Sequence, residues 1–119
     1  MKNQTKREAA WVLSNATKNG APEDVLALVS KYNLIGVFYE ALQQSTDEKT
    51  IGISLEGIYN ILKCGQMHFL QNGTNPFLVM VEQFGMVKKI EQLQEHISEE
   101  IYHKSIRILE EFFDLEDPI

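Results

Sequence analysis

The sequence has a single cysteine, Cys64, in 119 residues, which excludes an internal disulfide and a cysteine-based metal cluster and suits a reducing compartment. It has no apolar run close to the roughly 20 residues that a membrane-spanning helix needs, and no recognisable signal peptide. Basic residues are few, with 11 Lys and Arg against 17 Asp and Glu. Direct nucleic-acid binding requires surplus cations that displace counterions from phosphates. We therefore expect neither a membrane partner nor a nucleic-acid partner.

Apolar residues make up 44% of the chain and recur with the 3.6-residue period of helices, while the alternating pattern of strands is hard to find. Breaks between the periodic stretches fall at Gly20, Pro22, Ser45-Thr46-Asp47 and Gly73-Thr74-Asn75-Pro76. The sequence therefore predicts an all-α fold. Its helices are expected over about residues 5–19, 22–33, 34–44, 48–64, 76–84, 86–95 and 98–113.

Apolar spacing and glycines indicate how these helices end and pack. Gly20 is expected to end the first helix in the left-handed conformation, which glycine adopts without a Cβ clash. Gly52 and Gly57 lie inside the longest helix, where each costs up to about 1 kcal/mol, so they indicate the close approach of a neighbouring helix. The apolar face of the first helix is expected at Ala9, Val12, Leu13 and Ala16.

The chain is internally repeated, because short, medium and long helices follow one another twice after the first long helix. Residues 29–35 (VSKYNLI) have their counterpart in residues 81–87 (VEQFGMV). A period of about 40–50 residues with three helices is typical of armadillo solenoids, whereas a four-helix bundle needs helices of similar length. We expect about two and a half repeats of a right-handed superhelical solenoid in one segment, residues 1–119. Residues 5–20 form the last helix of an incomplete repeat, 21–66 the second repeat and 67–115 a third, capping repeat.

Polar and aromatic residues lie off the apolar stripes of the long helices. Glu8, Trp11 and Asn15 have i, i+3, i+7 spacing and share one ridge of the first long helix. The matching ridge is Glu56, Asn60 and Lys63 on the second long helix, and Arg107 and Glu111 on the third. Such a surface suits an extended peptide, because asparagine amides bond a main chain and an indole packs against a Lys or Arg stem. The pattern alone leaves the alternative that Trp11 belongs to the core.

Residues 6–17 (KREAAWVLSNAT) resemble the Trp…Asn helix of the importin-α (karyopherin-α) family. Residues 55–63 (LEGIYNILK) resemble that family's penultimate armadillo repeat, and residues 85–94 and 99–102 with Phe112 and Phe113 resemble its last. The likeness covers nearly the whole chain, in the same order of segments. It implies a nuclear protein import adaptor, represented here by its C-terminal armadillo repeats.

The resemblance also implies the roles of single residues. In the minor groove for nuclear localisation signals, Trp11 would hold a Lys or Arg stem, Asn15 the peptide backbone, and Glu8 the cationic tip. Glu56 and Arg107 take the tryptophan place on the next two ridges. The aromatic series therefore stops after one residue, as expected where the groove ends.

The partners implied by the resemblance are basic nuclear-localisation-signal peptides of cargo proteins and a CAS-type exportin at the last repeats. Importin-β would bind only through a basic N-terminal arm that does not appear in this sequence. The implied location is the cytoplasm and the nucleus, with shuttling between them. A truncated solenoid with an uncapped apolar end would also self-associate through residues 5–30. The alternative function is a generic armadillo or HEAT-type scaffold that binds another folded protein.

Catalytic and metal-binding patterns are missing from the sequence. His68, His96 and His103 have no ligand spacing with one another or with Cys64. No glycine-rich phosphate loop is present, and Cys64 has no His/Asp partner pattern that would make it a nucleophile. We expect no enzymatic activity, no metal site and no cofactor.

Overall fold

The computed structural model describes the backbone of residues 3–113 and the side chains of residues 7–113. Its helices are α1 (Asn3–Asn19), α2 (Pro22–Tyr32), α3 (Leu34–Gln44), α4 (Glu48–His68), α5 (Pro76–Gln83), α6 (Met86–Leu93) and α7 (Glu99–Phe112). Within residues 3–113 there is no β-strand, only an isolated bridge between Gln71 and Thr74. The all-α prediction is confirmed. Helix α4 continues four residues beyond its predicted end.

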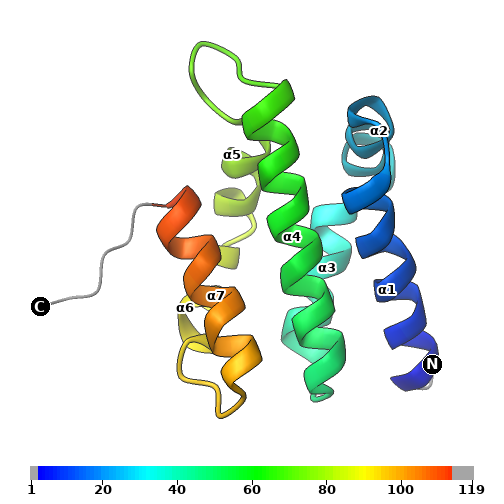
Figure 1. Cartoon of the computed structure of the whole chain (residues 1–119), viewed down its shortest axis with the longest axis vertical. Helices are drawn as coiled ribbons and strands as arrows, with labels where there is room; N and C mark the ends of the chain where they lie inside the picture. The colour runs from blue at the N-terminus through cyan, green and yellow to red at the C-terminus, as the bar shows by residue number, and fades with distance from the viewer. Residues whose placement is uncertain (1–2, 114–119) are drawn as a thin grey trace, which may run out of the picture.

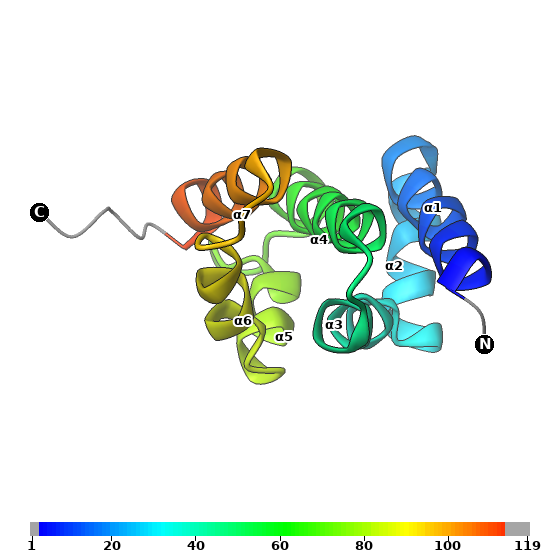
Figure 2. The same ribbon diagram turned by 90° about the horizontal axis from the view of Figure 1, so that it is seen from below.

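The helices are stacked one after another in two layers rather than bundled (Figures 1 and 2). Figure 2 shows α1, α4 and α7 in one row and α3, α5 and α6 in the other, with α4 in contact with both α1 and α7. The unit of two helices followed by a longer one occurs twice. The first two helices of each unit are equal in length, however: α2 and α3 have 11 residues each, and α5 and α6 have eight each.

Helix α4 is the centre of the core, because it contacts α1, α2, α3, α5 and α7. Its residues Leu55, Ile58, Ile61 and Leu62 are fully buried. A Cβ atom at Gly57 would clash with the buried ring of Phe38 from α3, so the predicted close approach is confirmed there. Gly52 is different: a Cβ atom would lie 3.7 Å from Lys104 Nζ, which leaves room for alanine.

The loops between helices are set by asparagines and by one glycine. Asn33 joins α2 to α3 in the left-handed conformation, with φ 53°. Asn75 caps α5 by accepting a hydrogen bond from the Phe77 amide at 3.1 Å, and its own amide donates to the Leu62 carbonyl at 2.8 Å. Gly85 has the positive φ that joins α5 to α6. The left-handed conformation predicted for Gly20 is wrong, although α1 does end at Asn19.

The predicted apolar face of α1 is only partly right. Ala9 and Val12 are exposed, whereas Ala10, Ser14 and Thr17 are buried against α4. Thr17 can be buried because its hydroxyl donates to the Ser14 carbonyl at 2.6 Å. A satisfied hydroxyl loses much of its desolvation penalty, so the face that packs is smaller and more polar than a hydrophobicity pattern indicates.

None of the described helices is by itself long and apolar enough to cross a membrane; α2 and α3 together reach that length and composition, with a 68° bend between them. Most apolar side chains of this pair lie in the core, as Val25, Val29, Leu34, Ile35, Phe38 and Leu42 are buried. Packing against the rest of the fold accounts for their composition.

Two glycine substitutions in α4 test the role of close packing. Gly57→Ala should lower the free energy of unfolding by about 1–3 kcal/mol, because the buried ring of Phe38 must shift to admit a methyl group. Gly52→Ala is the matched control in the same helix, and it should raise stability by about 0.5–1 kcal/mol, since alanine favours the helix and fits without overlap. Urea unfolding followed by circular dichroism measures both; equal effects at the two positions would contradict the packing argument.

Candidate functional site

Helix α1, which carries the predicted ridge, is tied to the start of α4 by an ion pair. Arg7 donates through Nε to Asp47 Oδ2 at 2.8 Å and through Nη2 to Asp47 Oδ1 at 3.0 Å. The Thr50 hydroxyl donates to the same carboxylate at 2.7 Å. The hydrogen bonds from Arg7 and Thr50 lower the pKa of Asp47 to about 2. This bidentate contact holds one end of α1 in a defined orientation.

A second polar contact holds the other half of α1. The Asn60 side-chain amide of α4 donates to Thr17 Oγ1 at 3.3 Å and lies 3.5 Å from the Ser14 carbonyl oxygen. Asn60 was predicted to bond the main chain of a peptide, but its amide nitrogen is directed to α1. Its carbonyl oxygen is the part that remains for a ligand.

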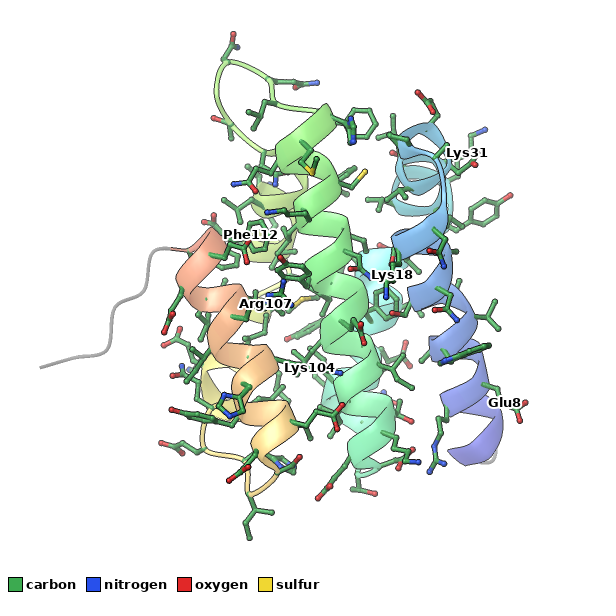
Figure 3. The ribbon with its side chains drawn as sticks, viewed as in Figure 1. Glu8, Lys18, Lys31, Lys104, Arg107 and Phe112 are labelled. Atoms are coloured by element: carbon green, nitrogen blue, oxygen red, sulfur yellow. The ribbon has the colours of Figure 1, made fainter. Side chains whose placement is uncertain are left out.

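The predicted ridge on α1 faces solvent. The Trp11 side chain is 58% exposed, so Trp11 is not a core residue. At about 100° per residue, Trp11 lies roughly a quarter turn from the buried face of α1. Asn15 is partly exposed and Glu8 is exposed. Figure 3 shows Glu8 on the outer side of α1, away from α4.

Lys104 of α7 occupies the space between α4 and α7 (Figure 3). Its ammonium group lies 3.4 Å from Glu56 Oε2 and 3.1 Å from Glu100 Oε1, and it donates to the Gly52 carbonyl at 3.4 Å. The carboxylate of Glu56, one of the predicted peptide-binding residues, is therefore already paired within the fold.

Arg107 is also engaged within the fold. Its guanidinium carbon lies 4.0 Å from the centroid of the Tyr59 ring, and its Nη2 donates to the Tyr59 hydroxyl at 2.9 Å. Glu111 accepts from the Tyr59 hydroxyl at 3.2 Å and from Lys63 Nζ at 2.9 Å. The hydrogen bond to Glu111 raises the pKa of Lys63. Partial desolvation of Glu111 opposes ionisation, but the bonds from Lys63 and Tyr59 outweigh it and lower the pKa of Glu111.

Two of the hollows that border α1 contain predicted site residues or apolar surface. The cationic hollow lies over α4 and has a volume of about 240 Å³; it is lined by Lys18, Glu56, Tyr59, Asn60, Lys104 and Arg107. The apolar groove lies between α1 and α3 and has a volume of about 340 Å³; its lining includes Ala9, Leu13, Val37, Phe38 and Ala41. Of the six predicted site residues, Glu56, Asn60 and Arg107 are thus engaged within the fold, and Trp11 on α1 exposes more than half of its side chain.

Comparison with known proteins agrees with this architecture. A family model described as an atypical Arm repeat matches residues 75–118. Importin subunit alpha-8 of Arabidopsis thaliana is 31% identical over 104 residues, which is 87% of this chain and 23% of the relative. Importin subunit alpha-5 of the same plant is 35% identical over 107 residues, or 90% of this chain and 20% of the relative. The probable importin subunit alpha-A of Dictyostelium discoideum is 34% identical over 101 residues, which is 85% of this chain and 18% of the relative.

The chain belongs to the importin-α family. The predicted all-α armadillo solenoid is confirmed as its fold class. This importin-α chain spans about a fifth of the length of the curated relatives it matches.

Sequence reasoning missed several residues that shape this importin-α surface. Lys104 lies three residues before Arg107 and so extends the predicted ridge of Arg107 and Glu111 to the i, i+3, i+7 spacing of the first ridge. That spacing could have identified Lys104. The pairing of Arg7 with Asp47 joins residues 40 positions apart and leaves no local signal in the sequence.

The described part of the importin-α chain offers no group of three or more His, Cys, Asp or Glu side chains that could hold a metal ion. Burial, with a further effect from Glu23, raises the pKa of the Cys64 thiol. A raised pKa leaves little thiolate at neutral pH, so Cys64 is poorly suited to nucleophilic chemistry.

The lowered pKa of Asp47 makes one component of stability pH-dependent. An unfolded Asp47 ionises near 3.8 and the folded one near 2, so the stabilisation is complete above about pH 5 and is lost as the pH falls towards 2. Asp47→Asn keeps a good helix-capping residue but removes the charge. The variant should be less stable than the parent chain at pH 7, and the difference should shrink as the pH falls to 2. Urea unfolding at several pH values measures it.

Arg7→Gln is the control for that experiment, because it removes the guanidinium and leaves Asp47. In the Asp47→Asn background it should change the free energy of unfolding little at any pH, since the pair is already broken. A stability difference between Asp47→Asn and the parent chain that stays constant down to pH 2 would show that the ionised pair contributes nothing.

Proposed function

We propose that this chain is the C-terminal armadillo-repeat part of a nuclear protein import adaptor, and that α1 binds a Lys/Arg-rich nuclear localisation signal. The observation that carries the proposal is the 58% exposed indole of Trp11, on one of three stacked long helices and one turn from Asn15. The relatives, named as importin alpha subunits, support the adaptor role at the level of the family. Proteins of that role act by binding, and we propose no catalysis.

The chemistry of the α1 site suits one basic side chain. The Trp11 ring can pack against the aliphatic stem of Lys or Arg, with a cation–π contribution of about 0.5–1 kcal/mol at an exposed site. The Asn15 amide can bond the peptide main chain, at a net gain of about 0.5–1.5 kcal/mol. Glu8 supplies the negative charge for the cationic tip. These gains are small against the entropic cost of association, so binding to this chain alone should be no tighter than about millimolar.

Glu56, Asn60 and Arg107 take a secondary part in this proposal. A peptide that reaches α4 must compete with Lys104 for Glu56 and with Tyr59 for Arg107. The carbonyl oxygen of Asn60 can still accept a main-chain bond. The α1 residues therefore contribute most of the affinity.

The remaining predictions follow from the same proposal. We divide the chain into an incomplete repeat ending at residue 20, a second repeat over residues 21–66 and a third over residues 67–115. A CAS-type exportin would bind the last repeats, and the adaptor would shuttle between cytoplasm and nucleus. Importin-β would act through an arm that the given sequence does not contain.

A lysine peptide tests the α1 site directly, because Trp11 is the single tryptophan of the chain. An acetylated peptide with two adjacent lysines flanked by glycine and serine should change Trp11 fluorescence, with half-saturation at about millimolar concentration. Amide chemical shifts on α1 should move in the same range, and Trp11→Ala should abolish these shifts.

Val12→Ala is the matched control, since Val12 is the next residue of α1 and is also 58% exposed, but on a different side of the helix. It should leave peptide binding unchanged. Equal loss in both variants would indicate a disturbed helix rather than a binding site, and the absence of any peptide-induced shift would contradict the proposed function. Micromolar binding that is lost in Trp11→Ala would contradict the proposed affinity of about millimolar.

A helical-repeat scaffold that binds a folded protein is the second candidate, and the apolar groove between α1 and α3 favours it. The groove has a volume of about 340 Å³, and Val37 at its edge is 44% exposed. Exposed apolar surface of this kind is a site of protein association. The α1 side of the groove belongs to residues 5–30, the segment predicted to self-associate, so we propose a second copy of this chain as the occupant; Val37 of α3 extends the surface beyond the predicted segment.

Light scattering across a concentration series tests this association. The chain should form dimers or larger species as its concentration rises, and Val37→Asp should shift it towards monomer by placing a charge in the apolar groove. Lys31→Glu, which adds negative charge on the exposed surface of α2, is the control and should not have this effect. A strict monomer at high concentration would contradict the self-association.

A further inference from the structure

The three stacked long helices carry opposite charges at equivalent positions. In the repeat register that aligns Trp11 with Arg107, Glu8 aligns with Lys104. An acidic residue beside an aromatic ring on α1 thus corresponds to two cations on α7. Glu8, the single acidic residue of α1, lies on the outer side of that helix, and cations of α1 and α7 line the hollow over α4 (Figure 3).

The positive charge gathers around the cationic hollow over α4. Three of its lining residues are cations, Lys18, Lys104 and Arg107, against the single carboxylate of Glu56. Figure 3 shows Lys18 between α1 and α4, and Lys104 and Arg107 beside α4 on its other side. The whole chain carries a net charge of −6, so this concentration of cations is local and opposite to the average.

The three cations differ in what they already contact. Lys104 is paired with Glu56 and Glu100, and Arg107 is stacked on Tyr59 with its Nε 3.8 Å from Glu111 Oε2. Lys18 forms no ion pair within the part of the chain whose side chains are described, and it is exposed. Lys18 is therefore the cation that can pair with a ligand without breaking a contact of the fold.

We propose that the cationic hollow is a carboxylate subsite, which takes an Asp or Glu side chain of the same peptide whose Lys or Arg packs on Trp11. This inference rests on the proposed function. It makes the preferred ligand a peptide of mixed charge rather than a uniformly basic one, because successive lysines would meet Lys18, Lys104 and Arg107 as like charges.

The spacing between the two charges of the ligand follows from helix packing. Neighbouring packed helices lie about 8–10 Å apart, and an extended peptide advances about 3.3 Å per residue. A peptide that crosses from α1 to the hollow over α4 therefore needs about three residues between its basic residue and its acidic residue. The peptide can run in either direction, so both orders belong in the test.

The experiment compares two acetylated peptides that both contain two adjacent lysines. Each peptide is made in two versions, with the variable residue on the N-terminal or on the C-terminal side of the lysines. One has a glutamate three residues away and the other has glutamine in its place. Binding is followed by amide chemical shifts of the parent chain and of Lys18→Ala and Lys18→Glu. Lys31→Glu is the matched control, because Lys31 is also an exposed lysine near the end of a helix but lies on α2 (Figure 3).

The parent chain should bind the glutamate peptide about two- to fivefold more tightly than the glutamine peptide in one of the two orders, and added salt should reduce the difference. Lys18→Ala should remove this preference and Lys18→Glu should reverse it, while Lys31→Glu should retain it. Shifts induced by the glutamate peptide should include Lys18 and residues around the cationic hollow.

The outcomes separate the two proposals. Equal binding of both peptides in both orders, or a preference that survives Lys18→Ala and Lys18→Glu, would overturn the carboxylate subsite and leave the Trp11 site intact. Binding of neither peptide, or binding unaffected by Trp11→Ala, would overturn the proposed function and the subsite together.

Discussion

The absence of a side chain at two positions of α4 is the constraint on which the rest of the structure depends. The ring of Phe38 from α3 occupies the space beside Gly57, and Asn75 and Phe77 from the α5 end occupy the space beside Gly65. A Cβ atom at either position would overlap these neighbours. Because α3 and α5 approach so closely, α4 can contact five other helices at once and place α1 and α7 on its two flanks.

Helix α1 is held against α4 to a large extent by polar contacts. Among the described side chains of α1, Ala10 is the buried apolar one, while Ser14, Thr17 and Asn60 form one hydrogen-bonded group and Arg7 pairs with Asp47. Directional bonds specify rotation about the helix axis better than apolar packing does, because a hydrogen bond requires a particular geometry. The outward direction of Trp11 is thus a consequence of what holds the buried face of its helix, a quarter turn away.

Helix positions could be predicted from the sequence, because the apolar period and the Asn, Gly and Pro breaks agree along the chain. The exposure of Trp11 could not be decided from the pattern alone, because Val12 on the predicted apolar stripe is just as exposed. The packed face of α1 could not be predicted, since Thr17 becomes suitable for burial only through the bonds of its hydroxyl to the Ser14 carbonyl and to the Asn60 amide, 43 residues away. The stacking of Arg107 on Tyr59 likewise depends on the register of two helices, and so local spacing showed the ridge without showing that its cation was already bound.

The connection between α4 and α5 has a separate consequence for how this solenoid tolerates variation. Its base is closed by the Gln71–Thr74 bridge and by Asn75, which bonds both the Leu62 carbonyl and the Phe77 amide. The tip, with Asn72 and Gly73 in left-handed conformations, projects beyond the end of α4 (Figure 1). Since the anchoring bonds lie below the tip, additional residues there would lengthen an exposed hairpin without changing the angle between the helices. The tip is therefore a natural place to attach a fluorophore or an affinity tag while both flanks of α4 stay unaltered.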